Sequence, residues 1–190
     1  MSSSLSAFHF LQQNRETMLE ELKSILSYPS ISGLDIHLDD CRRCAELIAE
    51  MLRRVGMEEV NLHPTAGGQP IVTASWCQAP GKPTVLIYGH YDVQPVDPLD
   101  EWFGDPFSAS IQNNRLIARG AADDKGQVFM HLKALEAVYG ADHRFPLNIK
   151  VIIEGQEEIG SRDLRSFLIN HKDYLSCDVA LVSDTMMWGE

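Results

Sequence analysis

The feature that most constrains the fold of this 190-residue chain is a set of short apolar runs, each bounded by turn residues. Residues 84–88 (Thr-Val-Leu-Ile-Tyr) are continuously apolar, which is typical of a strand that is buried on both faces. Similar runs occur at residues 70–76, 147–153 and 179–182, and we expect the last of these strands to be buried too. Helix-like segments alternate with these runs, so the sequence predicts an α/β fold around a central sheet.

Four segments have the apolar periodicity of helices. They comprise residues 5–27, residues from Asp39 or Asp40 to Arg54, residues 127–139 and residues 162–170. Ser161 is the expected N-cap of the last helix, because serine hydroxyls accept hydrogen bonds from free amides at helix starts. Two short strands, residues 108–111 and 116–118, are expected to turn at Asn113 and Asn114.

The composition argues against two classes of partner. The chain has 16 Lys and Arg against 27 Asp and Glu, and its formal net charge is -11. This charge disfavours binding to nucleic acid or to an anionic membrane surface. Carboxylates gathered to hold cations would produce such a charge, and so would simple solubility. No apolar run approaches the roughly 20 residues that span a bilayer. Residues 1–5 lack the basic start and apolar core of a signal peptide, so we expect a cytoplasmic protein.

The four cysteines fit the same compartment. Only Cys41 and Cys44 form a Cys-x-x-Cys pair, and they lie in a helical segment without a second such pair. A metal or redox role usually needs that second pair or a redox-type fold context. We therefore expect free thiols in a reducing environment.

The first polar cluster, Gly-His-Tyr-Asp at residues 89–92, directly follows a predicted strand. In an extended segment, His90 and Asp92 project to the same face because side chains repeat every two residues. The Asp92 carboxylate can then accept the second ring N–H of His90 and turn the other nitrogen toward a metal. Taken alone, a single histidine of this kind is more often a hydrogen-bonded histidine at a strand end than a metal ligand.

Two further aspartates occur at comparable positions. Asp123 lies in a loop of small residues, 119–126, just before a helix, and its two carboxylate oxygens suit it to bridge two cations. Asp184 follows the predicted strand at residues 179–182. Each has an ordinary alternative, because acids favour helix starts and aspartate favours turns.

Adjacent glutamates form the remaining cluster, Glu-Gly-Gln-Glu-Glu-Ile-Gly at residues 154–160. Glu157 and Glu158 cannot point the same way in an extended segment, so one can bind metal while the other acts as a general base. A solvated acidic loop is the alternative for this motif alone. The ordered recurrence of all four clusters at strand ends or a loop tip favours a two-metal site that shares a carboxylate. Such oxygen ligands with one imidazole suit zinc, manganese or cobalt.

These motifs resemble those of zinc-dependent aminoacylases, glutamate carboxypeptidases, succinyl-diaminopimelate desuccinylases and carnosinase-like dipeptidases. The resemblance runs from about residue 15 to the end of the chain. It rests on five motifs in order, at residues 28–32, 89–95, 118–126, 154–161 and 183–184. It implies a mixed central sheet flanked by helices, as in the catalytic domain of these zinc peptidases.

The resemblance also implies roles for individual residues. His90 and Asp184 would bind one metal, Glu158 the other, and Asp123 would bridge both. Asp92 would orient His90, and Glu157 would activate the water that attacks an amide bond and pass its proton to the leaving amine. The Asp at position 184 resembles the dipeptidase branch, since the carboxypeptidase and deacylase branches tend to have Glu there.

The family pattern extends beyond these 190 residues. Family members carry an inserted lid domain that mediates dimerisation, and a later segment that supplies the last metal histidine. We therefore expect residues 1–190 to be the N-terminal part of a metallopeptidase catalytic domain, incomplete and inactive alone, in a protein that forms a homodimer through the lid. The expected substrates are dipeptides or small peptides. The alternatives are deacylation of N-acyl amino acids and a truncated, non-catalytic metal-binding module.

Overall fold

The computed structural model describes residues 3–186 and has the mixed α/β architecture predicted from the sequence. Residues 1 and 2, part of the stretch without signal-peptide character, lie outside it. The longer helices are α1 (Ser3–Gln13), α2 (Arg15–Leu26), α3 (Leu38–Arg54), α4 (Lys125–Asp142) and α5 (Leu164–Asn170). Short 3-10 helices are η1 (Asp35–His37), η2 (Leu99–Glu101) and η3 (Glu157–Ile159).

Five strands form the central sheet in the order β1-β2-β6-β3-β7. Their bounds are β1 (Glu58–His63), β2 (Ile71–Trp76), β3 (Thr84–His90), β6 (Asn148–Glu154) and β7 (Val179–Val182). Strands β3, β6 and β7 run parallel, whereas β1 and β2 are antiparallel to their neighbours. A separate hairpin, β4 (Ser110–Gln112) with β5 (Arg115–Ile117), turns at the two asparagines as predicted.

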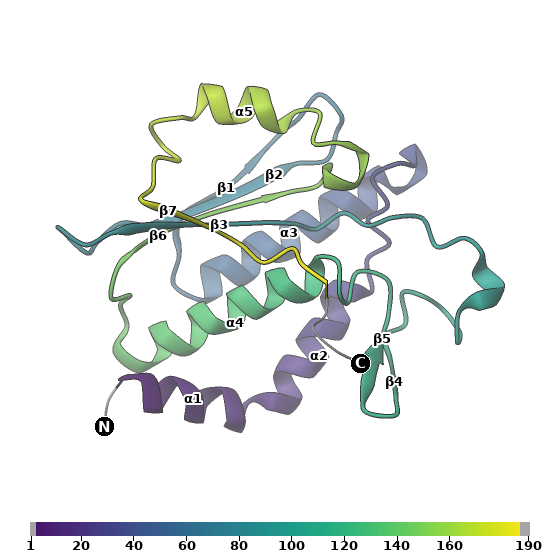
Figure 1. Ribbon diagram of the computed structural model, residues 1–190, viewed down its shortest axis with the longest axis horizontal. Helices are drawn as coiled ribbons and strands as arrows, with labels where there is room; N and C mark the ends of the chain where they lie inside the picture. Colours follow the sequence, from purple (N-terminus) through teal and green to yellow (C-terminus); the bar gives the residue numbers. More distant parts are fainter. Residues whose placement is uncertain (1–2, 187–190) are drawn as a thin grey trace.

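The helices cover both faces of the sheet. Figure 1 shows α3 and α4 below it, with α1 and α2 beyond them, and α5 above it. Strand β6 alternates accordingly: Val151 packs in the main core with the lower helices, whereas Ile152 joins Phe167 of α5 in a smaller cluster. Because β3, β6 and β7 are parallel, their carboxyl ends lie at one edge of the sheet.

Several sequence predictions need correction. The first helix is divided at Asn14, and β1 was not predicted because its burial pattern is mostly exposed and its sequence lacks an apolar run. Strand β7 is exposed at all four residues rather than buried, because it forms the edge of the sheet in the described chain. Ser161 does not cap α5, which begins at Leu164; its hydroxyl donates instead to the Glu154 carboxylate at 2.8 Å.

Candidate metal centre

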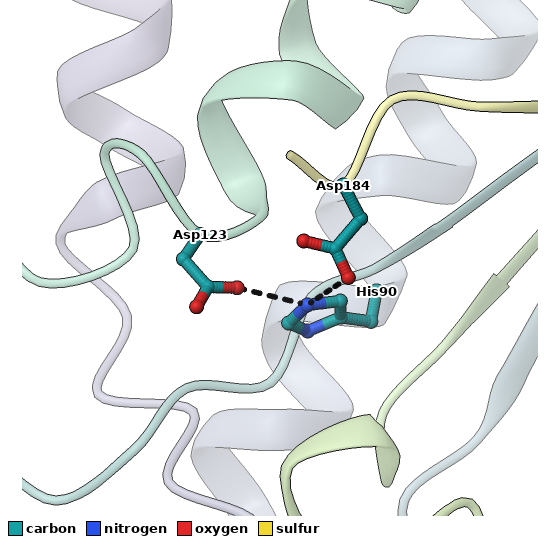
Figure 2. A group of neighbouring side chains, drawn as sticks. All are labelled: His90, Asp123 and Asp184. Carbon is teal, nitrogen blue, oxygen red and sulfur yellow. Dashed lines mark hydrogen bonds and ion pairs between the residues drawn. The ribbon is translucent and has the colours of Figure 1, made fainter. Parts of the chain in front are cut away.

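Three side chains that the sequence analysis singled out converge at the carboxyl edge of the sheet. His90 ends β3, Asp123 lies in the loop before α4, and Asp184 follows β7. The His90 Nε2 atom is 3.1 Å from Asp123 Oδ1 and 3.6 Å from Asp184 Oδ2, and Figure 2 shows both carboxylates directed at the ring. One ligand atom from each residue lies within 4.8 Å of the others, which is close enough to hold one ion. His90 is fully buried, while the Asp123 and Asp184 side chains are 63% and 30% exposed.

Asp92 determines how the His90 ring is oriented. The ring Nδ1 is 3.1 Å from the Asp92 carbonyl oxygen and 3.3 Å from its carboxylate Oδ1. Because both atoms accept hydrogen bonds, Nδ1 must be the donor. In the neutral imidazole, Nε2 therefore carries the lone pair and faces Asp123 and Asp184, which is the orientation of a metal-binding histidine.

The surrounding charges act strongly on His90. Burial opposes protonation of its ring, but the hydrogen bond and charge of Asp92, with the charges of Asp124 and Asp184, raise its pKa to about 10. The site thus favours a positive charge between its carboxylates, which a proton supplies in the metal-free chain. A divalent cation would meet the same electrostatic preference.

Asp124 contributes to this site and was missed by the sequence analysis. Its Oδ2 accepts the backbone N–H of His90 at 3.0 Å, and its side chain is almost completely buried. Burial raises its pKa to about 6. The neighbouring Gly89 makes the approach feasible, because a Cβ there would lie 2.8 Å from Asp124 Oδ2. That glycine, just before the histidine, was the available signal.

Glu157 and Glu158 lie on η3, across from Asp92. Their backbone N–H groups donate to the Asp92 carboxylate, at 3.2 Å to Oδ1 and 3.1 Å to Oδ2. The Glu158 carboxylate accepts a hydrogen bond from Gln94 Nε2 at 2.7 Å, so in the described chain it stands outside the group of three around His90. Burial raises the pKa of Glu158, Gln94 opposes this, and the negative charge of Asp123 adds to it.

Helix α4 holds the segment that carries Asp184. His131 Nε2 lies 2.9 Å from the Ser183 hydroxyl, within hydrogen-bonding distance. Gln127 Nε2 donates to the Ala122 carbonyl, in the loop that carries Asp123, at 2.6 Å. It also donates to the Thr185 carbonyl, next to Asp184, at 3.4 Å. The loop before α4 and the end of β7 are therefore linked through one helix. His131 lies outside the polar clusters of the sequence, so no motif marks this contact.

The donor set fits a divalent cation. One oriented imidazole and several carboxylates are ligands that zinc, manganese and cobalt accept. The buried ring and its buried Asp92 partner also match the arrangement in which a second carboxylate fixes a metal-binding histidine.

Comparison with known proteins identifies the family. The model of peptidase family M20/M25/M40 matches residues 86–189, more than half of the chain. The chain belongs to this family. A cysteinylglycine-S-conjugate dipeptidase of Corynebacterium striatum is 34% identical over 92% of this chain and 38% of its own length. A Beta-Ala-His dipeptidase of Mus musculus is 32% identical over 94% of this chain and 39% of its own length.

Solved structures of the M20 type have the same fold. Human carnosine dipeptidase 1 superimposes with a TM-score of 0.89 at 30% identity, over 98% of this chain and 42% of that one. The dipeptidase Dug1p of Saccharomyces cerevisiae gives a TM-score of 0.87 at 26% identity, over 97% and 42%. The expected family and the mixed sheet are thus confirmed. The chain spans about two fifths of the length of these relatives. None of the described helices has the length and apolar character needed to span a membrane.

Proposed function

We propose that this M20-family chain carries the metal- and water-handling part of a hydrolase that cleaves the amide bond of dipeptides or small peptides. The observation that carries the proposal is the convergence of Asp123 and Asp184 on Nε2 of the buried His90, whose Nδ1 is held by Asp92. The relatives named above act on dipeptides, which supports that substrate class over N-acyl amino acids.

The proposed ligand set divides between two ions. His90 and Asp184 would hold one ion, Glu158 would hold the other, and Asp123 would share its two oxygens between them. When bound, zinc or another divalent ion would polarise the amide carbonyl and lower the pKa of water. To bind an ion, the Glu158 carboxylate would give up its hydrogen bond from Gln94. Gln94 is exposed and Glu158 is partly exposed, so both side chains have room to move.

Glu157 is the proposed general base. It is adjacent to Glu158 on the single turn of η3, so the two side chains leave the backbone in different directions and can take different roles. The bond from the Glu157 N–H to Asp92 holds the backbone that carries this carboxylate. Glu157 would take a proton from water and deliver it to the leaving amine.

The same proposal covers the organisation of the protein. Residues 1–190 would be the N-terminal part of the catalytic domain, in a cytoplasmic homodimer that pairs through a lid domain. The histidine that completes the second metal site would come from outside these residues. Alone, the chain would bind metal and turn substrate over poorly or not at all.

Zinc binding by the purified chain tests the proposed metal site. We expect the purified chain to bind zinc in calorimetric titration, and Asp184→Asn to weaken that binding by about tenfold or more. Asp178→Asn is the matched control, since Asp178 accepts the Thr84 N–H at the opposite end of the β3–β7 pair. Failure of the wild-type chain to bind any divalent ion would reject the metal site.

Substrate class is tested by comparing a dipeptide panel with N-acetyl amino acids, in a protein extended to the full length of the relatives. We expect dipeptides to be hydrolysed, and Glu157→Ala to abolish turnover while leaving zinc binding intact. A clear preference for N-acetyl amino acids would favour the deacylase alternative. Metal binding with no hydrolysis of either class would favour the non-catalytic module.

A further inference from the structure

The Asp92 carboxylate is the point where the two halves of the candidate site meet. It is fully buried and receives four donors from the described chain: the His90 ring at 3.3 Å, the N–H groups of Glu157 and Glu158 at 3.2 and 3.1 Å, and the Ser32 hydroxyl at 2.6 Å. A buried carboxylate needs such partners, since desolvation of an unpaired charge is costly. One carboxylate thus connects the histidine ligand to the turn that carries the base.

The Ser32 bond differs from the other three. It is the shortest, and it comes from a segment that lies more than 50 residues away in sequence from either half of the site. Hydroxyl donors to ionised carboxylates are short and stronger than neutral hydrogen bonds. The Ser32 hydroxyl and the Glu158 N–H both donate to Asp92 Oδ2. The Ser32 bond therefore restricts rotation of the carboxylate about the Cβ–Cγ bond of Asp92.

The Ser32 segment is held in place independently of that hydroxyl. Residues Ile31 and Val93 form a parallel bridge, and the Val93 N–H donates to the Ser30 carbonyl at 3.0 Å. The Ser30 hydroxyl donates to the Tyr91 carbonyl at 2.7 Å. The backbone of residues 30–32 therefore lies along residues 91–93 whether or not Ser32 has its Oγ.

A second polar connection runs behind the same turn. Buried Gln69 donates to the Ser32 carbonyl at 3.1 Å, and buried Gln156 donates to the Gln69 side-chain oxygen at 3.0 Å. Gln156 directly precedes Glu157. Because this connection uses the Ser32 carbonyl, it also survives removal of the hydroxyl, and the contribution of the hydroxyl can be isolated.

We propose that Ser32 is a positioning residue of the hydrolytic site. Its hydroxyl fixes the Asp92 carboxylate, and Asp92 in turn sets both the His90 ring and the backbone of Glu157 and Glu158. The expected consequence for metal binding rests on the proposed function. The effect of Ser32 on the Asp92 carboxylate and on the amides bound to it does not, and it can be measured in the metal-free chain.

The experiment compares Ser32→Ala with Ser30→Ala in the whole chain. Each substitution removes one hydroxyl from a buried serine, and the two serines are two residues apart. Only Ser32→Ala removes a bond to a carboxylate, because the Ser30 hydroxyl donates to a backbone carbonyl. We expect Ser32→Ala to raise the zinc dissociation constant about tenfold, the lower range for partners of metal ligands. Ser30→Ala should change it less than twofold, and Ser32→Thr should restore near wild-type affinity.

The second readout is amide hydrogen exchange at Glu157 and Glu158 in the metal-free chain. Ser32→Ala should speed exchange at these two amides about tenfold, as expected when a charge-assisted bond to their acceptor is lost. Ser30→Ala should leave them within twofold of wild type. Comparable thermal midpoints for the two alanine variants would confirm that global stability does not cause the difference.

The outcomes separate the two proposals. If the wild-type chain binds zinc but the alanine variants behave alike in both readouts, the role of Ser32 is overturned and the metal site stands. If exchange responds to Ser32→Ala while the wild-type chain binds no zinc, Ser32 positions Asp92 as inferred and the proposed function fails. If Ser32→Thr behaves as Ser32→Ala does, with its fold intact, the hydroxyl is not the determinant and the inference is overturned.

Discussion

Gly89 on β3 lies directly against Asp124 and against the Val128 side chain of α4. A Cβ at this position would lie 2.6 Å from Val128 Cγ2 and 2.8 Å from Asp124 Oδ2, both closer than real contacts allow. We therefore expect Gly89→Ala to lower the free energy of unfolding by about 1–3 kcal/mol, the usual cost of overpacking, and to weaken zinc binding by displacing Asp124 from the His90 N–H. Urea denaturation and calorimetry measure the two effects.

Gly140 provides the control for that substitution. It lies in α4, and a Cβ there would meet nothing within 4 Å. Gly140→Ala should stabilise the chain by about 0.5–1 kcal/mol through helix propensity and leave zinc binding unchanged. If both variants destabilised the chain equally, the close approach at Gly89 would not be the cause.

The protonation of His90 should appear in the pH dependence of stability. Its folded-state pKa of about 10 lies above the ordinary value of 6.5. The contribution to stability is thus complete below pH 6.5 and is lost as the pH rises through 10. In chelator, the free energy of unfolding should fall between pH 7 and 9 by up to about 1.4 kcal/mol per pH unit. His90→Gln lacks the titrating ring, so its free energy of unfolding should depend less on pH. If the wild-type chain and this variant showed the same pH dependence, His90 would not be the group responsible.

At the level of residues, the sequence was sufficient for motifs but not for contacts that depend on folding. His90, Asp123 and Asp184 could be predicted because each follows a recognisable strand or loop motif, and the structure brings them together. Asp124 could not be assigned, since only the close approach of β3 to α4 makes it an acceptor for the His90 N–H. The metal-binding roles of His90, Asp123, Asp184 and Glu158 remain predictions, and so does the role of Glu157 as a base.

At the scale of the secondary-structure elements, β7 combines apolar sequence with an exposed edge. Val179, Leu181 and Val182 are 55%, 41% and 53% exposed, and β7 pairs only with β3 in the described chain. Unprotected apolar edges promote association between chains. We expect Val179→Lys combined with Val182→Lys to reduce self-association in light scattering. The free energy of unfolding should change by less than about 1 kcal/mol, because exposed sites tolerate substitution.

A charge added elsewhere separates an edge effect from simple solubility. Leu168→Lys combined with Ile169→Lys places two lysines on the exposed face of α5, where the wild-type side chains are 38% and 66% exposed. These changes should reduce self-association less than the β7 pair does. An equal reduction would mean that net charge, rather than the strand edge, controls association.

Strands β1 and β7 show two limits of prediction from sequence patterns. A pattern can identify a strand without showing whether that strand is buried, and a strand without an apolar pattern is not identified at all. The apolar run at β7 correctly predicted a strand, but whether it is buried depends on what lies beside it, which a local pattern does not contain. Strand β1 has the opposite property: its residues are mostly exposed and polar, so no periodic signal marks it, and pairing with β2 makes it a strand.

At the scale of the whole molecule, the cysteines report on folding of the main core. All four are free, as predicted; Cys41 and Cys44 are buried on α3, whereas Cys77 and Cys177 are exposed. Burial, with a smaller contribution from the Asp92 charge, raises the pKa of the Cys41 thiol to about 12. A thiol reagent should therefore modify two cysteines quickly in the native chain and all four in denaturant.

Labelling of the two buried thiols then measures how a bound cation stabilises the entire fold. Manganese suits this test because it favours oxygen and imidazole ligands over thiolates. At a free concentration 100 times its dissociation constant, it should stabilise the folded chain by about 2.7 kcal/mol and slow labelling of Cys41 and Cys44 about a hundredfold, provided that they react through global unfolding. Asp123→Ala removes an exposed ligand at little cost to the core and should abolish the slowing. Protection by manganese that persists in this variant would mean that the ion stabilises the chain from somewhere other than the site at the end of β3.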